Sequence, residues 1–240
     1  MKFAIFGDIH ANLEAFNAVL TDAAEQGCTE HVCIGDIVGY NANPSECLQK
    51  VVELNCPTVK GNHDEEASID TDITGLNPLA QRALEWTRDA LSEEEKQWLR
   101  DLRMVRQVGD FTIVHATLDS PTGWAYVMNK LDAMASFSYQ FTPLCFFGHT
   151  HAPRIYVKDG RVSAEDSLTA TIEPGKKYFI NVGSVGQPRD GDWRSSYCVH
   201  DSEAKTVSIR RIPYDLRTAQ DKIAQAGLPP MLSERLAHGR

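Results

Sequence analysis

Two pairs of side chains able to bind metal are each spaced two residues apart in this sequence. Asp8 stands two residues before His10, and His149 stands two residues before His151. In an extended chain, residues i and i+2 point to the same side, so each pair can offer two ligands to one cavity. Imidazole nitrogens and carboxylate oxygens together suit Mn²⁺, iron, Zn²⁺, Co²⁺ or Ni²⁺. The spacing therefore predicts that the two pairs bind metal.

Three further candidate ligands, Asp36, Asn62 and His115, each follow a short apolar run that is typical of a buried strand. The complete set is two carboxylates, one amide oxygen and four imidazoles, which exceeds the four ligands of a tetrahedral zinc site. Seven nitrogen and oxygen ligands suit two metals that share a bridging carboxylate. Two such metals can activate a bridging water and bind the attacking and leaving oxygens of a phosphoryl transfer.

Phosphoryl transfer to water also needs a proton donor for the leaving group, and His63 is the candidate. His63 directly follows Asn62, so if Asn62 points at the metals, the histidine can face the leaving-group oxygen instead. The neighbouring Asp64 can orient the imidazole and raise its pKa, as general-acid catalysis near neutral pH requires. We therefore predict His63 and Asp64 as catalytic residues.

The predicted strands and helices that position these residues indicate an α/β fold. Five apolar runs each end at a polar cluster that holds the candidate residues, and helical patterns over 12–26 and 46–54 separate the first three runs. Parallel strands joined in this way have their carboxyl ends at one sheet edge, where open α/β sheets bind ligands. The five runs span residues 2–7, 31–35, 58–60, 111–114 and 145–147.

The rest of the chain adds helices and then strands. Residues 65–103 read as a helical insert after the third strand, with a capping box at its Ser92. Later residues predict a terminal helix over 216–226, and nothing in the sequence marks a linker, so we expect one domain over residues 1–240. The later predicted strands span 154–157, 177–182, 196–200 and 206–212.

Composition limits the partners and the compartment. The 33 acidic and 24 basic residues give a net charge of −9, which argues against nucleic acid as the main partner. The first apolar stretch ends at Asp8, short of a signal peptide, and no apolar run reaches the roughly 18 residues of a membrane span. The six cysteines include no C-x-x-C pair, and a cytosolic domain of this size does not need disulfides. We therefore expect a cytoplasmic protein that does not bind membranes.

Five blocks of the sequence, in order, resemble the signature of the calcineurin-like metallophosphoesterases. Any one block is weak, but five in order at predicted strand ends are specific. Residues 181–189 further resemble the single-domain prokaryotic branch of that superfamily. One departure is Ala116, where the family often has glycine after the histidine of the fourth block. The blocks are Asp8-x-His10, Gly35-Asp36-x-x-Gly39, Gly61-Asn62-His63-Asp64, His115 and Gly148-His149-x-His151.

The resemblance implies a four-layer α/β/β/α sandwich, with two mixed β-sheets flanked by helices. It also implies a dinuclear site that hydrolyses phosphomonoesters or phosphodiesters, with manganese as the first candidate metal. The implied bridging ligand is Asp36, and His63 would contact phosphate and protonate the leaving group. The implied ligands of the first metal are Asp8, His10 and His151, and those of the second are Asn62, His115 and His149.

Several alternatives stay open on the sequence alone. Arg189 either neutralises substrate charge or pairs with Asp190 or Asp192. Asn12 either caps the first helix or reaches phosphate, and residues 183–186 form either a tight turn or a phosphate cradle.

The partner is also open. We expect a small phosphorylated substrate or a phosphoprotein, with pocket walls formed by residues 65–103 and 118–128. A non-catalytic scaffold in a protein complex, or a nuclease with the same metals, are the alternative functions, and the oligomeric state is not predicted.

Overall fold

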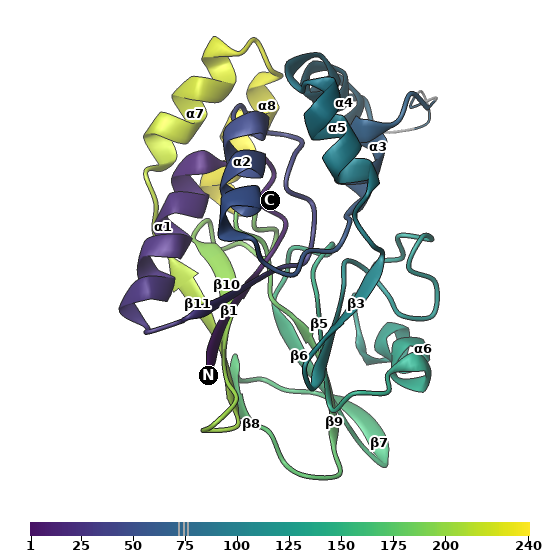
Figure 1. The fold of residues 1–240 in the computed structure, drawn as a ribbon. Helices are drawn as coiled ribbons and strands as arrows, with labels where there is room; N and C mark the ends of the chain where they lie inside the picture. The colour runs from purple at the N-terminus through teal and green to yellow at the C-terminus, as the bar shows by residue number, and fades with distance from the viewer. Residues whose placement is uncertain (72, 74, 76) are drawn as a thin grey trace.

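Two β-sheets stack face to face and helices cover their outer faces (Figure 1). The structure, a computed structural model, describes residues 1–71, 73, 75 and 77–240. Each sheet mixes parallel and antiparallel neighbours. This confirms the predicted α/β sandwich of two mixed sheets.

The first sheet has five strands and contains the N-terminal strand β1. Strands β1 and β2 are parallel, as expected for strands joined by a helix, whereas the other neighbours in this sheet are antiparallel. Its strands, in spatial order, are β2 (Glu30–Cys33), β1 (Lys2–Phe6), β10 (Ser195–Asp201), β11 (Thr206–Ile212) and β8 (Thr169–Thr171).

The second sheet has six strands and a parallel centre. Strands β4, β5 and β9 run parallel, so their carboxyl ends lie at the same edge. Strands β3 and β6 pair antiparallel to this centre, and β7 pairs antiparallel to β6. Its strands, in spatial order, are β3 (Val105–Val108), β4 (Phe111–Val114), β5 (Leu144–Phe147), β9 (Lys177–Asn181), β6 (Arg154–Asp159) and β7 (Arg161–Ala164).

Strand side chains alternate between the core of the sandwich and the helices outside it. On β1, Ile5 faces the space between the sheets, and Ala4 and Phe6 pack under the outer helices. On β5, Phe146 faces the other sheet and Phe147 packs on the opposite side. Because both faces of these strands are buried, their sequences are continuously apolar instead of alternating with polar residues.

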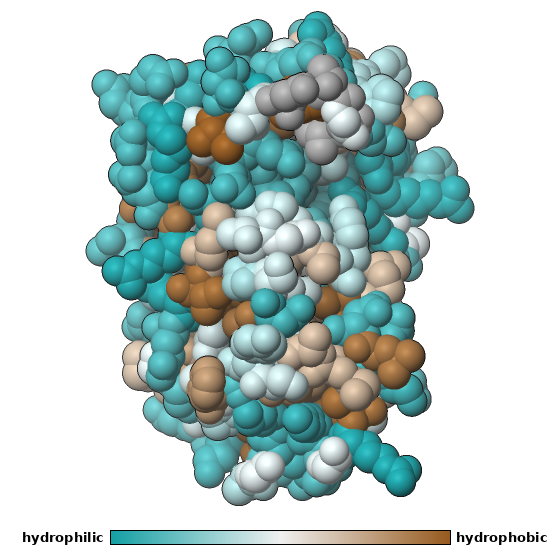
Figure 2. Space-filling model, turned by 90° about the vertical axis from the view of Figure 1, so that its right-hand side faces the viewer, coloured by the Kyte–Doolittle hydropathy of each residue, from teal (hydrophilic) through white to brown (hydrophobic). Residues whose placement is uncertain are grey.

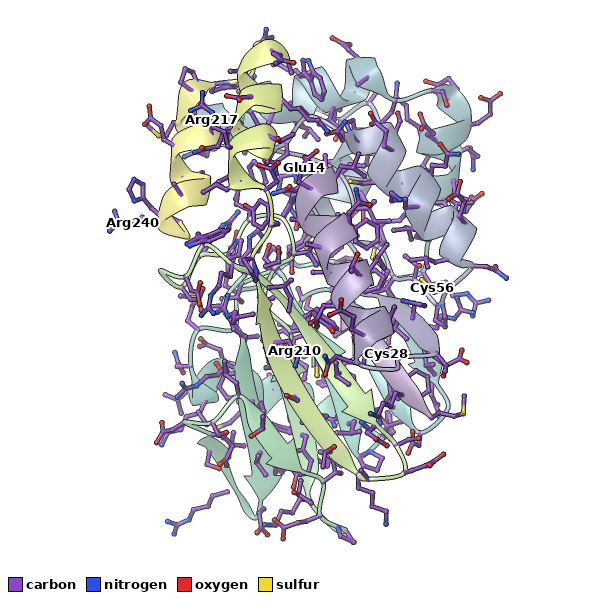
Figure 3. The ribbon with its side chains drawn as sticks, turned by 90° about the vertical axis from the view of Figure 1, so that its left-hand side faces the viewer. Glu14, Cys28, Cys56, Arg210, Arg217 and Arg240 are labelled. Atoms are coloured by element: carbon purple, nitrogen blue, oxygen red, sulfur yellow. The ribbon has the colours of Figure 1, made fainter. Side chains whose placement is uncertain are left out.

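The helices form the two outer layers. Arg210 of β11 donates two hydrogen bonds to Asp22 of α1 (Figure 3). Lys222 of α7 forms an ion pair with Glu14 of α1. The helices with buried side chains in the apolar cluster that also contains the outer face of the five-stranded sheet are α1 (Leu13–Glu25), α2 (Pro44–Leu54), α3 (Asn62–Ser68), α4 (Pro78–Ala90), α5 (Glu93–Arg100), α7 (Leu216–Gln225) and α8 (Pro230–His238).

A single helix, α6 (Lys130–Tyr139), covers the six-stranded sheet in the described part of the chain. Its Ala133 and Phe137 are buried on the sheet, whereas Leu131 and Met134 are exposed. Figure 2 shows hydrophobic surface among hydrophilic surface on this side of the molecule. In the described ranges, no helix has both the length and the apolar character that a membrane span requires.

The third predicted strand, residues 58–60, was wrong. Thr58 and Val59 form only isolated bridges, with Cys33 and Arg103. The chain then turns at Gly61 and begins α3 at Asn62, so the helical insert starts three residues earlier than predicted. Strands β3, β7 and β8 and helices α6 and α8 were not predicted, because each is short and its sequence lacks a strong apolar period.

Candidate metal centre

The predicted ligands meet at one end of the sandwich, where the strands finish. Asp8 follows β1, Asp36 follows β2, His115 follows β4, and the segment with His149 and His151 follows β5. Their side chains form two buried groups with candidate ligand atoms within 4.8 Å of one another, and Asp36 belongs to both. The first group is Asp8, His10, Asp36 and His151, and the second is Asp36, His115 and His149.

The backbone brings these side chains together by tight turns, not by the extended geometry predicted from their i, i+2 spacing. Asp8, His10, Asp36, His149 and His151 all have φ between 47° and 62°, in the left-handed region. Such a conformation in a residue with a side chain costs about 1–2 kcal/mol, and it persists where the surroundings hold it in place. The prediction that each pair converges is confirmed, but its geometric reason was wrong.

Hydrogen bonds from the imidazole rings fix which nitrogen faces the centre. The Nδ1 atoms of His10, His115 and His151 lie 3.1, 2.8 and 2.6 Å from the main-chain oxygens of Val38, Ile34 and Gln187. A carbonyl oxygen only accepts, so each Nδ1 donates and each Nε2 points at the cluster.

His149 is reversed relative to the other three histidines. Its Nε2 lies 2.8 Å from the main-chain oxygen of Trp124 and donates to it, so Nδ1 is the nitrogen left for a ligand. The ring is stacked on Tyr126, with 4.2 Å between ring centroids. Residue 124 therefore contributes to the centre through its backbone, which the sequence motif does not reveal.

Two imidazole lone pairs face each other in the first group. The Nε2 atoms of His10 and His151 are 3.0 Å apart, and both Nδ1 atoms already carry the proton. Burial lowers the pKa of both histidines well below the usual value, so neither ring gains a second proton near neutral pH. Two acceptors this close need a cation between them, which is an arrangement that a bound metal ion supplies.

The two carboxylates of the centre have opposite electrostatic surroundings. Burial raises the pKa of Asp8, and the neighbouring Asp36 raises it further. Burial alone would raise the pKa of Asp36, but the neighbouring histidines together hold it well below the usual range, with the largest share from His115, whose Nε2 lies 3.3 Å from Oδ2. Burial is the largest effect on His115 and disfavours its charged form, but Asp36, Asp8 and the main-chain oxygen of Ile34 together raise the pKa of His115 to about 10. In the protein without metal, this proton takes the place of a cation.

Asn62 lies in the first turn of α3, and its side-chain oxygen has no hydrogen-bond partner among the described residues. The Nε2 atom of His115 is also buried without a hydrogen bond of good geometry. A buried polar atom without a partner is unfavourable, and a metal ligand removes that penalty by coordination. The donor set therefore fits a second divalent metal beside the first.

Two glycines of the sequence blocks are required because side chains of the centre occupy the space of a Cβ. A Cβ on Gly61 would lie 2.1 Å from Oδ1 of Asp36, and a Cβ on Gly148 would lie 2.2 Å from Oδ2 of Asp8. Neither carboxylate can keep its position if a larger residue replaces its glycine. The glycines of these motifs thus hold the two carboxylates in place.

Asp64 does not orient the His63 ring, so this predicted contact is corrected. Its carboxylate accepts hydrogen bonds from the backbone amides of Asp36, Ile37 and Gly61, at 2.8 to 3.0 Å. Successive residues of a helix point in different directions, and Asp64, in the first turn of α3, faces the backbone of the Asp36 loop. Its side chain positions the loop that holds Asp36.

The His63 side chain lies beside the cluster and is buried. Its ring centroid is 4.9 Å from that of His10 and 4.4 Å from that of Tyr40. Its Nδ1 has no hydrogen-bond partner in the described part of the chain and faces Gly39, where a Cβ would approach it to 2.6 Å. Packing, and not the predicted carboxylate, holds this ring.

The structure speaks against one of the two alternatives for Arg189, the pairing with an aspartate. Asp190 pairs with Arg211 and Asp192 pairs with Arg194, so neither carboxylate is paired with Arg189. The Arg189 guanidinium instead lies 5.6 Å from the ring centroid of Tyr40, beside the centre. Sequence reasoning missed Tyr40, although it directly follows Gly39 of the second block.

Asn12 and residues 183–186 have structural roles. The Asn12 side chain accepts from the Ala15 amide as the cap of α1 and donates to the Gly186 oxygen. The Gly186 amide in turn donates to the Asp8 oxygen. The segment therefore packs against the loop that holds Asp8, as the tight-turn alternative predicted.

Comparison with known proteins agrees with the fold and the motifs. The profile of the calcineurin-like phosphoesterase superfamily domain matches residues 1–205. A metallophosphoesterase from Sphaerobacter thermophilus is 38% identical, with a TM-score of 0.89 over 100% of this chain and 99% of that one. The uncharacterized protein MJ0912 of Methanocaldococcus jannaschii is 36% identical over 99% of this chain and 98% of its own.

A more distant structure shares the fold alone. The hypothetical protein PH1004 from Pyrococcus horikoshii is 18% identical, with a TM-score of 0.82. That alignment covers 100% of this chain and 98% of that protein.

Proposed function

The chain belongs to the calcineurin-like phosphoesterase superfamily, and on that premise we propose that it hydrolyses phosphoesters with two divalent metal ions. The observation that carries the proposal is the pair of unprotonated Nε2 atoms, of His10 and His151, that face each other beside a carboxylate. Asp8 Oδ1 lies 3.2 Å from the same His151 nitrogen. These three donors converge on a point that only a cation can occupy favourably.

In the proposed site, Asp36 is the ligand common to both metals, since it belongs to both groups of donors. The first metal would be held by Asp8, His10 and His151, and the second by Asn62, His115 and His149. When bound, two divalent metals lower the pKa of a water and neutralise charge on the phosphate. Manganese is the first candidate, because mixed nitrogen and oxygen donors without thiolate suit it.

His63 is the proposed proton donor to the leaving group. Burial lowers the pKa of this histidine in the free protein, and the charge of Arg189 lowers it further, against the opposing effect of Asp36. The negative charge of a bound phosphate acts in the other direction and favours the protonated ring. Substrate binding would therefore prepare the acid that the reaction uses.

The proposed substrates are small phosphorylated molecules, with both monoesters and diesters to be tested and phosphoproteins as a second class. The proposed compartment is the cytoplasm, where thiols stay reduced, and the six cysteines are all free. They are Cys28, Cys33, Cys47, Cys56, Cys145 and Cys198.

The first test measures metal content and turnover in the same preparation. The monoester p-nitrophenyl phosphate and the diester bis-p-nitrophenyl phosphate are assayed separately. We expect chelation to abolish the hydrolysis of both, and added Mn²⁺ to restore the hydrolysis of at least one. Elemental analysis should then find about two metals per chain. Metal-loaded protein that hydrolyses neither ester nor a phosphopeptide would contradict the proposal and favour a scaffold.

The acid role of His63 is tested with two leaving groups. We expect His63→Ala to reduce kcat by about 10²–10⁴-fold for an alkyl phosphate, which needs a proton, and far less for p-nitrophenyl phosphate. Metal content should not change. Equal loss on both substrates would show that His63 binds phosphate without donating a proton.

A further inference from the structure

A cavity of about 560 Å³ lies beside the metal centre, between the start of α4, the loop at Tyr126 and the end of α8. This volume is in the range of small-molecule sites. The start of α4 and Tyr126 belong to the two segments predicted as pocket walls, whereas α8 was not predicted to contribute. Its lining includes Tyr40, Leu79, Tyr126, Arg189, Arg235 and His238.

The cavity adjoins the centre, because two tyrosines line the cavity and pack against histidines of the centre. Tyr40 lines the cavity and packs against His63 and His10, with 4.4 and 4.8 Å between ring centroids. Tyr126 lines the cavity and is stacked on His149. The cavity is therefore separated from the histidines of the centre by one tyrosine side chain on each side.

The cavity is cationic, although the whole chain is acidic. Arg189, Arg235 and Arg240 line it together with a single acidic side chain, that of Glu234. The guanidiniums of Arg189 and Arg235 lie 5.6 and 5.9 Å from the same Tyr40 ring centroid. In the described part of the chain, neither guanidinium lies within 4 Å of a side-chain carboxylate.

The hydrogen bonds of these two arginines leave donors unused. Arg189 donates to the side-chain oxygen of Gln187, and its Nε is buried without a partner among the described residues. Arg235 donates from Nε to the main-chain oxygen of Arg240, which lies just after α8 (Figure 3). Burial lowers the pKa of Arg235, and the charge of Arg189 lowers it further. Two neighbouring cations with free donors are stabilised by an anion that both can bind.

We propose that this cavity binds a second phosphate group of the substrate, between Arg189 and Arg235, while the phosphate to be cleaved lies at the metal centre. The inference rests on the proposed function and narrows its substrate class to small phosphoesters that carry two phosphates. Guanidiniums bind phosphate in a bidentate manner, which suits the paired donors here.

The Tyr40 side chain indicates the separation of the two phosphates. Its ring packs against the site histidines and against both guanidiniums, so the two anion sites are about one aromatic ring apart. This separation favours two phosphates on a sugar-sized unit over two phosphates joined directly. Nucleoside bisphosphates and sugar bisphosphates share this chemistry.

The test compares substrates that differ only in the second phosphate. One pair is adenosine 3′,5′-bisphosphate and adenosine 5′-monophosphate, and the other is fructose 1,6-bisphosphate and fructose 6-phosphate. We expect kcat/KM of the wild-type protein to favour the bisphosphate by at least about tenfold in one pair, which also identifies the carrier of the phosphates. Arg189→Gln and Arg235→Gln should each reduce this ratio about tenfold, and Arg189→Lys should reduce it less.

Arg217→Gln is the matched control, because Arg217 on α7 is largely exposed (Figure 3) and its ion-pair partner among the described residues is Asp221. It should leave the ratio unchanged. Calorimetric binding of the same compounds to chelator-treated protein supplies a readout that does not need turnover. The bisphosphate should bind more tightly than the monophosphate, and both glutamine variants should lose the difference.

The outcomes separate the inference from the proposed function. If the wild-type protein hydrolyses p-nitrophenyl phosphate but shows no preference for a bisphosphate in rate or binding, the inference is wrong and the proposed function stands. If it hydrolyses no ester, the proposed function is wrong, and the binding difference still decides whether the cavity takes a second phosphate.

Discussion

The space between the sheets and the end where the strands finish are built from the same strands but satisfy burial in opposite ways. Between the sheets, Ile5 and Phe111 are buried among apolar side chains and need nothing else. Three residues after Ile5, Asp8 is equally buried beside another carboxylate and three imidazoles. The apolar core is stable as folded, whereas the buried polar groups at the strand ends need a cation to balance them. Stability and activity therefore depend on different residues.

The largest expected effect comes from Asp36→Asn, which removes the carboxylate common to both ligand groups. We expect kcat to fall by at least about 10³-fold, with loss of bound metal, since a neutral amide bridges two cations poorly. Elemental analysis and phosphoesterase assays measure both effects. Asp201→Asn, at the far end of β10 from the ligands, is the control and should retain both metals. Full metal content in the Asp36 variant would show that this residue does not bridge.

The second effect is on stability alone. Phe111 is 1% exposed, lies at the start of β4, and makes edge contacts with Phe3 and Phe146. We expect Phe111→Ala to lower the free energy of unfolding by about 3–5 kcal/mol and to leave kcat close to wild type below its melting temperature. Chemical denaturation and activity at low temperature measure the two.

If the alanine variant does not fold, Phe111→Leu should show a smaller loss of the same kind. A large fall in kcat of folded protein would contradict the separation between core and strand ends.

The smallest expected effect is a gain in stability, in contrast to the loss in the Phe111 variants, and it is measured on metal-free protein. Burial and Asp36 raise the pKa of Asp8 above its usual 3.8, so the folded chain binds this proton more tightly than the unfolded chain. The contribution of Asp8 to wild-type stability therefore falls as the pH rises above about 4, until its folded-state pKa is passed. Asp8→Asn removes this loss, although it also removes a metal ligand.

Thermal unfolding across pH 3 to 8 measures the difference in melting temperature between the wild-type protein and the Asp8→Asn variant, both treated with chelator. We expect the variant to melt at the higher temperature near pH 8, by about 2–4 °C per kcal/mol gained, and the difference to vanish near pH 3. A wild-type protein that is more stable than the variant at pH 8 would contradict this sign.

Much of the fold and the identity of the ligand cluster could be predicted from the sequence, because apolar runs and short motifs are local signals. The path of the backbone at the ligands could not, since the left-handed φ of Asp8 and His10 depends on loops that pack around them. The role of Asp64 was missed for a related reason, because its partners are backbone amides about 27 residues earlier.

The cavity wall on α8 shows the other limit of sequence reasoning. Arg235 is about 200 residues from Tyr40 along the chain, and it reaches that ring because α7 and α8 fold back over the five-stranded sheet. A short helix with only Leu232 and Leu236 buried gives little periodic signal. Pockets made from distant segments therefore require the tertiary structure.

The left-handed backbone at five ligand positions offers a way to sort relatives by sequence. Glycine adopts that conformation without a steric penalty, whereas aspartate and histidine each lose free energy there. A descendant that stopped binding metal would gain stability by exchanging these residues for glycine or asparagine. Aligned chains with such exchanges have lost candidate metal ligands, whereas chains that keep all five acids and histidines retain them. The positions to compare are those of Asp8, His10, Asp36, His149 and His151.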